Sequence, residues 1–245
     1  MNQLSNAFSM LDLDVSDSQE DSELAAIGVG KRNKEDDCSG EVTKLENDND
    51  GEKVGIGNDE FKLPLVWIDL EMTGLNVEVD RILEIACVIT DGKLTKIVEG
   101  PDLVINQPKE CLDNMGEWCQ EHHATSGLTE KVLGSTITIE EAEKQVIEFV
   151  KSNVGGTYSP LLAGNSVYVD FLFLKKYMPE LANLFSHVLV DVSSVKALCI
   201  RWFPRENKRA PRKENKHRAM DDIKESIAEL KYYKDSIFKF TRFRN

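Results

Sequence analysis

The stretch LVWIDLEM, residues 65–72, places two carboxylates directly after an apolar run. The run from Leu65 to Ile68 predicts a short buried strand. Asp69 and Glu71 lie two positions apart at its end, so their side chains project from the same face of a sheet. Two like charges a few ångströms apart repel, so either one is protonated or a cation lies between them. The alternative is a strand end with two solvated acids.

A third acid lies inside another apolar segment. Asp170 interrupts SVYVDFLFL, residues 166–174, whose pattern predicts a mostly buried helix. A charge among buried side chains needs a partner. That partner is either a cation shared with Asp69 and Glu71 or a salt bridge to Lys175 or Lys176.

The fourth acid is found by its angle on a predicted helix at residues 218–234. With Ile223 at zero on a wheel of about 100° per residue, Ile227 and Leu230 lie within about 60° and mark the core face. Asp222 flanks that face at about 100°, whereas Asp221 lies at about 160°, toward solvent. We therefore expect Asp222, and not Asp221, to face the other acids.

Carboxylates from three separated segments are the ligands that hard divalent cations such as Mg²⁺ or Mn²⁺ prefer. Two such ions about 4 Å apart can bind both the attacking and the leaving oxygen of a phosphodiester. His217 precedes the predicted helix and is a candidate general base, although a lone histidine there is more often a surface residue. These residues together predict a two-metal hydrolytic site.

Three of these segments resemble a known family. DLEMTGL, GNSVYVDFLFL and HRAMDDIKESI are similar to the three motifs of the DEDD-type 3′→5′ exonucleases, in the subclass that contains a histidine. W…HHATSGL and DVSSVKALCIRWFP narrow the resemblance to the oligoribonuclease family. The resemblance covers about residues 63–238.

The resemblance implies a ribonuclease-H-like fold and a homodimer that degrades very short RNAs, especially dinucleotides, to mononucleotides. It implies that two divalent cations, Mg²⁺ or Mn²⁺, are held by Asp69, Glu71, Asp170 and Asp222, and that His217 activates the attacking water. It further implies that the bases lie between Leu75 and Trp118, and that the 5′ phosphate end is held by His123, Ser166 and Ser193.

One pair of positions departs from the family pattern. Before DVS the family often has a Tyr-Arg pair that reaches the substrate in the partner subunit and caps its 5′ phosphate. Here the two positions are His187 and Val188. Valine cannot supply the charge of arginine, so we expect a less strict limit on substrate length.

The pattern as a whole predicts an α/β fold, with a mixed five-stranded sheet and helices on both faces. The expected strands are residues 65–70, 82–90, the segment KIVEGPDLVIN after the Asp91-Gly92 turn, 161–164 and 187–192. The main expected helices are a segment in which Met115, Trp118, Cys119 and His122 share one face at i, i+3, i+4 and i+7, residues 138–151, the segment SVYVDFLFLKKY, 194–202 and 218–234.

The first 60 residues differ from the rest in charge. They hold 16 acidic and 5 basic residues, whereas residues 61–245 hold 27 acidic and 25 basic ones. With Phe8 as its only aromatic residue, this segment has too little apolar surface to offset its ordering entropy, which predicts disorder. A calcium loop at residues 12–23 is disfavoured because Asp17 stands where such a loop needs glycine. We therefore expect an acidic, disordered segment 1–60 and an exonuclease domain at 61–245.

The rest of the composition limits location and partners. No stretch reaches the ~18 apolar residues of a membrane span, and no signal or transit peptide is recognisable. Five cysteines without a CxxC pair favour reduced thiols and no zinc site. We expect a cytoplasmic protein, with mitochondria as the alternative.

Residues 201–218 carry eight basic residues against two acidic ones, which either attract a nucleic-acid backbone or form an ordinary solvated loop.

Three other functions remain open from the residues. DLEMT resembles the DxDxT loop of aspartyl phosphatases, but Glu71 stands where that loop needs aspartate and His217 has no role in it. An inactive RNA-binding module is disfavoured by the complete set of acids. A DEDD-type exonuclease acting on longer RNA or DNA is the main alternative.

Overall fold

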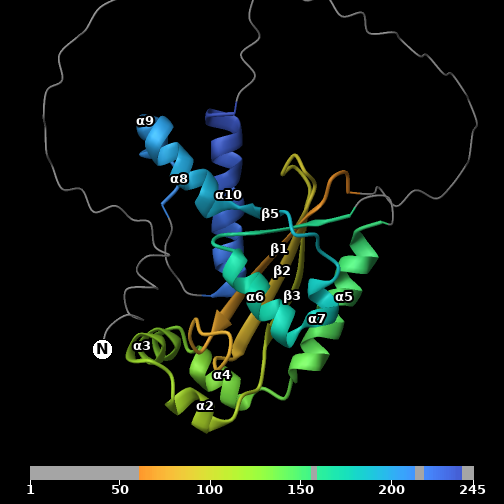
Figure 1. The fold of residues 1–245 in the computed structure, drawn as a ribbon, viewed down its shortest axis with the longest axis vertical. Coiled ribbons are helices and arrows are strands. Elements are labelled where there is room, and N and C mark those ends of the chain that lie inside the picture. The colour runs from red at the N-terminus through yellow and green to blue at the C-terminus, as the bar shows by residue number, and fades with distance from the viewer. Residues whose placement is uncertain (1–60, 156–158, 213–217, 239–245) are drawn as a thin grey trace, which may run out of the picture. The chain divides into compact units, whose positions relative to one another are not determined.

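The computed structural model describes residues 61–155, 159–212 and 218–238, and within them five strands form one mixed sheet (Figure 1). The strands are β1 (Leu65–Met72), β2 (Ile82–Thr90), β3 (Ile97–Val104), β4 (Leu161–Gly164) and β5 (Leu189–Asp191). Their order is β3-β2-β1-β4-β5. The first three strands pair antiparallel, and β4 pairs parallel with β1 and β5. The predicted five-stranded mixed sheet is confirmed.

The helices follow the predicted order, with four short additions. The described helices are α2 (Lys109–Asp113), α3 (Glu117–Thr125), α4 (Leu128–Gly134), α5 (Ile139–Asn153), α6 (Tyr168–Tyr177), α7 (Pro179–Ala182), α8 (Val192–Trp202), α9 (Pro204–Asn207) and α10 (Ala219–Ser236). The last strand begins at Leu189 and ends at Asp191, within the predicted residues 187–192. It ends one residue early because the Asp191 side chain accepts a hydrogen bond from the amide of Ser193 and starts α8 there.

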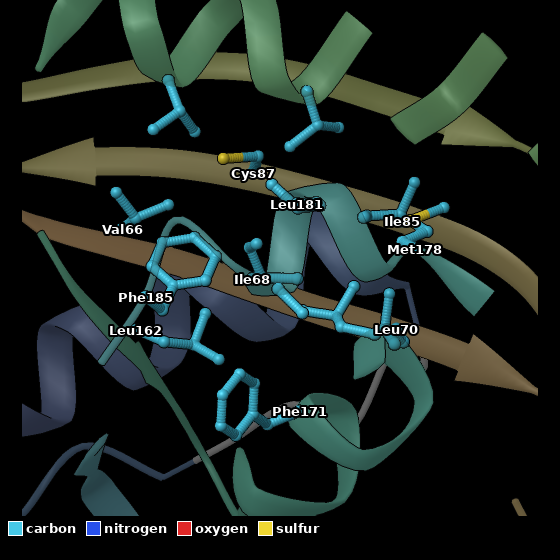
Figure 2. Packing of buried hydrophobic residues seen from close by; sticks show 14 of the residues in the cluster. Val66, Ile68, Leu70, Ile85, Cys87, Leu162, Phe171, Met178, Leu181 and Phe185 are labelled. Atoms are coloured by element: carbon cyan, nitrogen blue, oxygen red, sulfur yellow. The ribbon is translucent and has the colours of Figure 1, made fainter. Parts of the chain in front are cut away.

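Alternate residues of β1 pack into two separate cores. Val66, Ile68 and Leu70 join the larger cluster, which contains buried residues of α5, α6 and α7 (Figure 2). Leu65 and Trp67 point the other way, into a cluster with residues of α8 and α10. The predicted helices on both faces are confirmed, and Figure 1 shows α5 and α10 on opposite sides of the sheet. Because side chains alternate along a strand, residues 69 and 71 continue the α10 side.

The pairing of β1 with β4 ends early. It extends only from Leu65, opposite Leu161, to Trp67, opposite Ala163. The last residues of β1 therefore keep the partner strand β2 on one side, while the other side is open to side chains of α6. This arrangement places the end of β1 between α6 and α10. No helix in the described part of the chain is long and apolar enough to cross a membrane.

Candidate active site

Three of the predicted acids lie together where β1 meets α10. One carboxylate oxygen from each of Asp69, Glu71 and Asp222 lies within 4.8 Å of the others. Asp69 and Glu71 come from the α10 side of β1, and Asp222 comes from the first turn of α10. Asp221, its neighbour, is not in this group. The structure thus brings together the acids that strand alternation and the helical wheel selected.

The electrostatics of this group favour a cation. The pKa of Glu71 is raised to about 8, first by burial and then by the negative charges of Asp222, Glu84 and Asp170. The positive charge of Arg218 lowers the pKa of Glu71, but its contribution is the smallest of these. Three oxygen donors at this spacing fit a divalent cation such as Mg²⁺, which would stabilise the ionised carboxylates.

Asp170 reaches the same strand from α6. Its Oδ1 accepts a hydrogen bond of 3.0 Å from the backbone amide of Leu70, where β4 no longer pairs with β1. The side chain is buried, and burial raises its pKa to about 8. Lys175 instead lies over the Phe171 ring, and Lys176 pairs with Glu78, so neither lysine pairs with Asp170 in the structure. The negative charge of Asp170 contributes to the raised pKa of Glu71, although Asp170 is not among the three acids whose oxygens lie within 4.8 Å of one another.

A further acid, which is buried on β2, was not predicted. Glu84 is fully buried on β2, in register with Glu71 on β1. Its carboxylate accepts hydrogen bonds from Arg218 Nε at 3.1 and 3.2 Å and from Arg218 Nη2 at 2.5 Å. The amide of Ala219 donates to the same carboxylate at 3.3 Å. The sequence signal was available, since Glu84 interrupts the apolar strand ILEIACVIT as Asp170 interrupts its helix.

His123 lies beside the acids. It is 2% exposed, and its Nε2–H donates a hydrogen bond of 2.9 Å to the carbonyl of Met72. The other ring nitrogen, Nδ1, lies 3.9 Å from Oε2 of Glu71. The hydrogen bond from His123 to the Met72 carbonyl also fixes α3 against the end of β1. The predicted contact of His123 with a 5′ phosphate stays a prediction.

Ser166 and Ser193 meet in one hydrogen-bond network. Their hydroxyl oxygens lie 2.9 Å apart, and Ser193 donates to Oδ1 of Asn165 at 2.8 Å. The amides of both serines donate to Oδ1 of Asp191. Ser166 has a φ of 52°, in the left-handed region that non-glycine residues rarely adopt. The two predicted residues are thus held together by this network, through their amides on Asp191 and their hydroxyls on each other.

The two residues expected to flank the bases lie on separate elements. Trp118 of α3 stacks on His122, with ring centroids 3.8 Å apart and an angle of 21° between the rings. His122 was placed on the same helical face as Trp118 by the sequence, but its stacking was not predicted. The structure therefore gives the indole ring a fixed support from within its own helix.

Leu75 lies in a tightly bonded loop after β1. Thr73 donates to Oδ1 of Asp80 at 2.9 Å, and the amide of Asn76 donates to its Oδ2 at 2.8 Å. The loop needs glycine at position 74, because a Cβ there would come within 2.5 Å of the Asp80 carboxylate. Leu75 is half-buried on this loop.

His217 and Lys213, Glu214 and Lys216 of the basic segment lie outside the described residues, as do residues 1–60. Arg218, the next residue after His217, is described and lies at the start of α10.

Known proteins share much of this sequence. A family model described as Exonuclease, RNase_T, matches residues 66–230. The chain is 63% identical to an oligoribonuclease of Arabidopsis thaliana, over 99% of this chain and 100% of that protein. It is 52% identical to a mitochondrial oligoribonuclease of Homo sapiens, over 71% of this chain and 73% of that protein.

Solved structures share the fold. Exonuclease I of Methylocaldum szegediense has a TM-score of 0.56 at 16% identity, covering 72% of this chain and 41% of that chain. Exonuclease I of E. coli in complex with an oligonucleotide has a TM-score of 0.54 at 15% identity, with the same coverage. This chain spans about two fifths of those proteins, so the likeness concerns the ribonuclease-H-like fold alone. The identities over nearly the whole chain, together with the acidic site, show that this protein belongs to the oligoribonuclease family of exonucleases.

Proposed function

We propose that this chain is a 3′→5′ exoribonuclease that degrades short oligoribonucleotides, dinucleotides especially, to nucleoside 5′-monophosphates. The observation that carries the proposal is the group of Asp69, Glu71 and Asp222, whose oxygens lie within 4.8 Å of one another. The high identity to proteins named oligoribonuclease sets the substrate class.

In this proposal Asp69, Glu71, Asp170 and Asp222 hold two divalent cations, Mg²⁺ or Mn²⁺. When bound, such ions polarise the phosphodiester and lower the pKa of a coordinated water. His217 then accepts a proton from the attacking water. Its immediate neighbour Arg218 is fixed at the start of α10, four residues before Asp222, which supports this role.

The substrate would lie between the end of β1 and α3. Leu75 and Trp118 would flank the bases, and the His122 ring supports the indole from one side. Ser166 and Ser193 would hold the 5′ phosphate end through their hydroxyls. The Asp191 carboxylate accepts from both serine amides, the Ser193 hydroxyl donates to Asn165 Oδ1 and the Ser166 hydroxyl lies against it. To donate to a phosphate, the hydroxyls would therefore have to turn from these partners.

We also propose that the protein is a cytoplasmic homodimer whose exonuclease domain is residues 61–245. His187 and Val188 are exposed directly before β5, where the family pattern places residues that reach the partner. Leu198, Trp202 and Phe203 at the end of α8 and just beyond it are also exposed, and such apolar side chains are common in subunit interfaces. Light scattering of the purified protein tests the dimer.

The deciding experiment compares RNAs and DNAs of two, five and twenty nucleotides with Mg²⁺ present. We expect release of nucleoside 5′-monophosphates from the 3′ end, with the highest kcat/KM for the RNA dinucleotide and none in Asp69→Ala. A preference for long RNA or DNA would favour the alternative exonuclease reading. A phosphoenzyme trapped at Asp69 would support a phosphatase, and RNA binding without release would support a binding module.

A further inference from the structure

We infer that Glu84 is a positioning residue, which holds Arg218 and thereby sets where α10 begins and where Asp222 reaches the acidic group. The inference rests on the proposed function, because it gives the acidic group its role as a metal site. Neither the three sequence motifs nor the expected ligand set includes Glu84.

The contacts of Glu84 are of a kind that fixes a helix end. The carboxylate is fully buried and accepts from both Nε and Nη2 of Arg218, which is a two-point contact with the planar guanidinium. It also accepts from the amide of Ala219. Arg218 is the N-terminal cap residue of α10 and makes no capping hydrogen bond with its own side chain. Glu84, from a strand 134 residues earlier, therefore supplies the cap.

One helical turn joins this contact to the acidic group. The amide of Asp222 donates a hydrogen bond of 3.0 Å to the carbonyl of Arg218. The carbonyl of Asp222 in turn accepts from the hydroxyl of the buried Ser226 at 2.8 Å. The backbone of Asp222 is thus fixed through Arg218, and Arg218 is fixed through Glu84. A shift of the guanidinium would move Asp222 relative to Asp69 and Glu71.

The same pair keeps a positive charge away from the metal ligands. Arg218 is close enough to Glu71 to lower its pKa, yet its Nε and Nη2 atoms are directed at Glu84. Asp102 on β3 and Asp221 on α10 also act on Arg218 electrostatically. Without the Glu84 carboxylate, the guanidinium would be free to turn toward Glu71 and Asp222. It would then compete with a divalent cation for the same oxygens.

The test measures binding of Mn²⁺ to metal-free protein by calorimetry, together with hydrogen exchange of the first-turn amides of α10. In Glu84→Gln we expect the Kd for Mn²⁺ to rise by about 10–100-fold, which is typical when the partner of a ligand-bearing element is lost. The Asp222 amide should exchange faster. In the double variant E84Q/R218Q the Asp222 amide should still exchange faster than in wild type, because the contact that fixes the start of α10 is lost. Its Mn²⁺ affinity should recover only the part that E84Q loses to competition by the guanidinium.

A matched control uses another ion pair that joins α10 to the sheet. Lys224 Nζ lies 2.9 Å from Oε2 of Glu99 on β3, and both side chains are largely exposed. Lys224→Ala should leave Mn²⁺ affinity and kcat within about twofold of wild type, as expected for a surface pair. An equal effect of Lys224→Ala and Glu84→Gln would overturn the inference, because any contact between α10 and the sheet would then affect metal binding to the same extent.

A second variant covers the case in which Glu84→Gln does not fold. Arg218→Lys keeps the charge but loses the two-point contact. We expect its kcat on a dinucleotide to fall about 10–100-fold while KM stays within about threefold, because the ligands move and the base-binding residues do not.

Unchanged kcat in Arg218→Lys, or unchanged Mn²⁺ affinity in Glu84→Gln, would show that Glu84 does not position Asp222. A wild-type protein inactive on RNA would contradict the proposed function, whereas the Mn²⁺ and exchange measurements would still decide the role of Glu84.

Discussion

The backbone amide of Leu70 donates a hydrogen bond to Oδ1 of Asp170, and this contact joins the end of β1 to the first turn of α6. Leu70 lies between Asp69 and Glu71 in the sequence. The hydrogen bond therefore fixes the strand segment that carries two of the metal-ligand candidates. Asp170 thus combines a structural contact with a negative charge, and the two can be separated by substitution.

Asp170→Asn should abolish activity while keeping the fold. The asparagine Oδ1 can still accept from the Leu70 amide, but it carries no charge for a cation. Loss of an outer-shell partner of a metal ligand typically costs up to about 100-fold in activity. Because Asp170 is expected to be a ligand itself, we expect kcat to fall by more than this. The metal-free variant should melt no lower than wild type at pH 8, since the buried carboxyl with a pKa near 8 is gone. Melting several degrees below wild type would show that the charge itself stabilises the fold.

Asp222→Asn and Asp221→Asn are a matched pair on one helical turn. Only the oxygen of Asp222 lies within 4.8 Å of those of Asp69 and Glu71. Asp222→Asn should remove nearly all turnover and weaken Mn²⁺ binding, whereas Asp221→Asn should keep most of both. Steady-state rates on a dinucleotide, with circular dichroism to check folding, measure this difference. Similar losses in the two variants would mean that Asp221 also binds the metal.

The part of the site that sequence predicted is the part set by local periodicity. Asp69 and Glu71 share a face because strand side chains alternate, and Asp222 follows from its angle to Ile223 on one helix. These relationships need no knowledge of the rest of the fold. Trp118 and His122 are four residues apart on a helix, so their proximity could also have been predicted.

What the sequence did not predict depends on contacts between distant segments. The sequence predicts that Glu84 lies in a strand, but it does not predict the contact with Arg218, which is 134 positions away. The same argument that selected Asp170, a charge inside an apolar run, applies to Glu84. His123 was expected at the substrate, but its contact with the Met72 carbonyl arises only when α3 packs against the end of β1. The sequence does not predict the four short helices α2, α4, α7 and α9, because fewer than two turns of helix show little periodicity.

Stability of the metal-free protein should fall as pH rises from about 5 to 8.5. The carboxyl of Glu71 ionises near 4.5 when it is exposed, but its pKa is raised to about 8 in the folded protein. Between these values the folded state binds more protons than the unfolded state, so the free energy of unfolding decreases with rising pH. Below pH 4.5 both states are protonated and this contribution is constant. Thermal melting at several pH values in EDTA measures the slope.

Glu71→Gln and added metal are the controls for that slope. The glutamine amide cannot ionise, so the variant should show a weaker dependence on pH than wild type. Mg²⁺ or Mn²⁺ binds the ionised carboxylates, so it should raise the melting temperature of wild type more at pH 8.5 than at pH 5. An identical slope in wild type and Glu71→Gln would assign the pH dependence to other groups.

The residues before β5 are where this chain departs from its family, and they bear on substrate length. His187 and Val188 are exposed directly before the strand, and Val188 is 49% exposed. Valine offers no hydrogen-bond donor, whereas an arginine at this exposed position would carry a charged fork that matches a phosphate. The remaining candidates for the 5′ phosphate are Ser166, Ser193 and His123, and the two serine hydroxyls lie 2.9 Å apart.

Val188→Arg should therefore sharpen the preference for short substrates. A chain that removes nucleotides from the 3′ end discriminates against longer RNA only if something closes the other end of the site. A bidentate contact from arginine to the 5′ phosphate of a dinucleotide is stronger than a neutral hydrogen bond and fixes its geometry. The 5′ phosphate of a longer RNA would lie beyond position 188, so the arginine would not strengthen its binding.

We expect the ratio of kcat/KM for two- against five-residue RNA, each with a 5′ phosphate, to rise about tenfold, equivalent to about 1.4 kcal/mol. Val188→Gln, which has no charge, should change the ratio less, and RNAs without a 5′ phosphate should not respond. An unchanged ratio in Val188→Arg would mean that the 5′ end is closed by other residues.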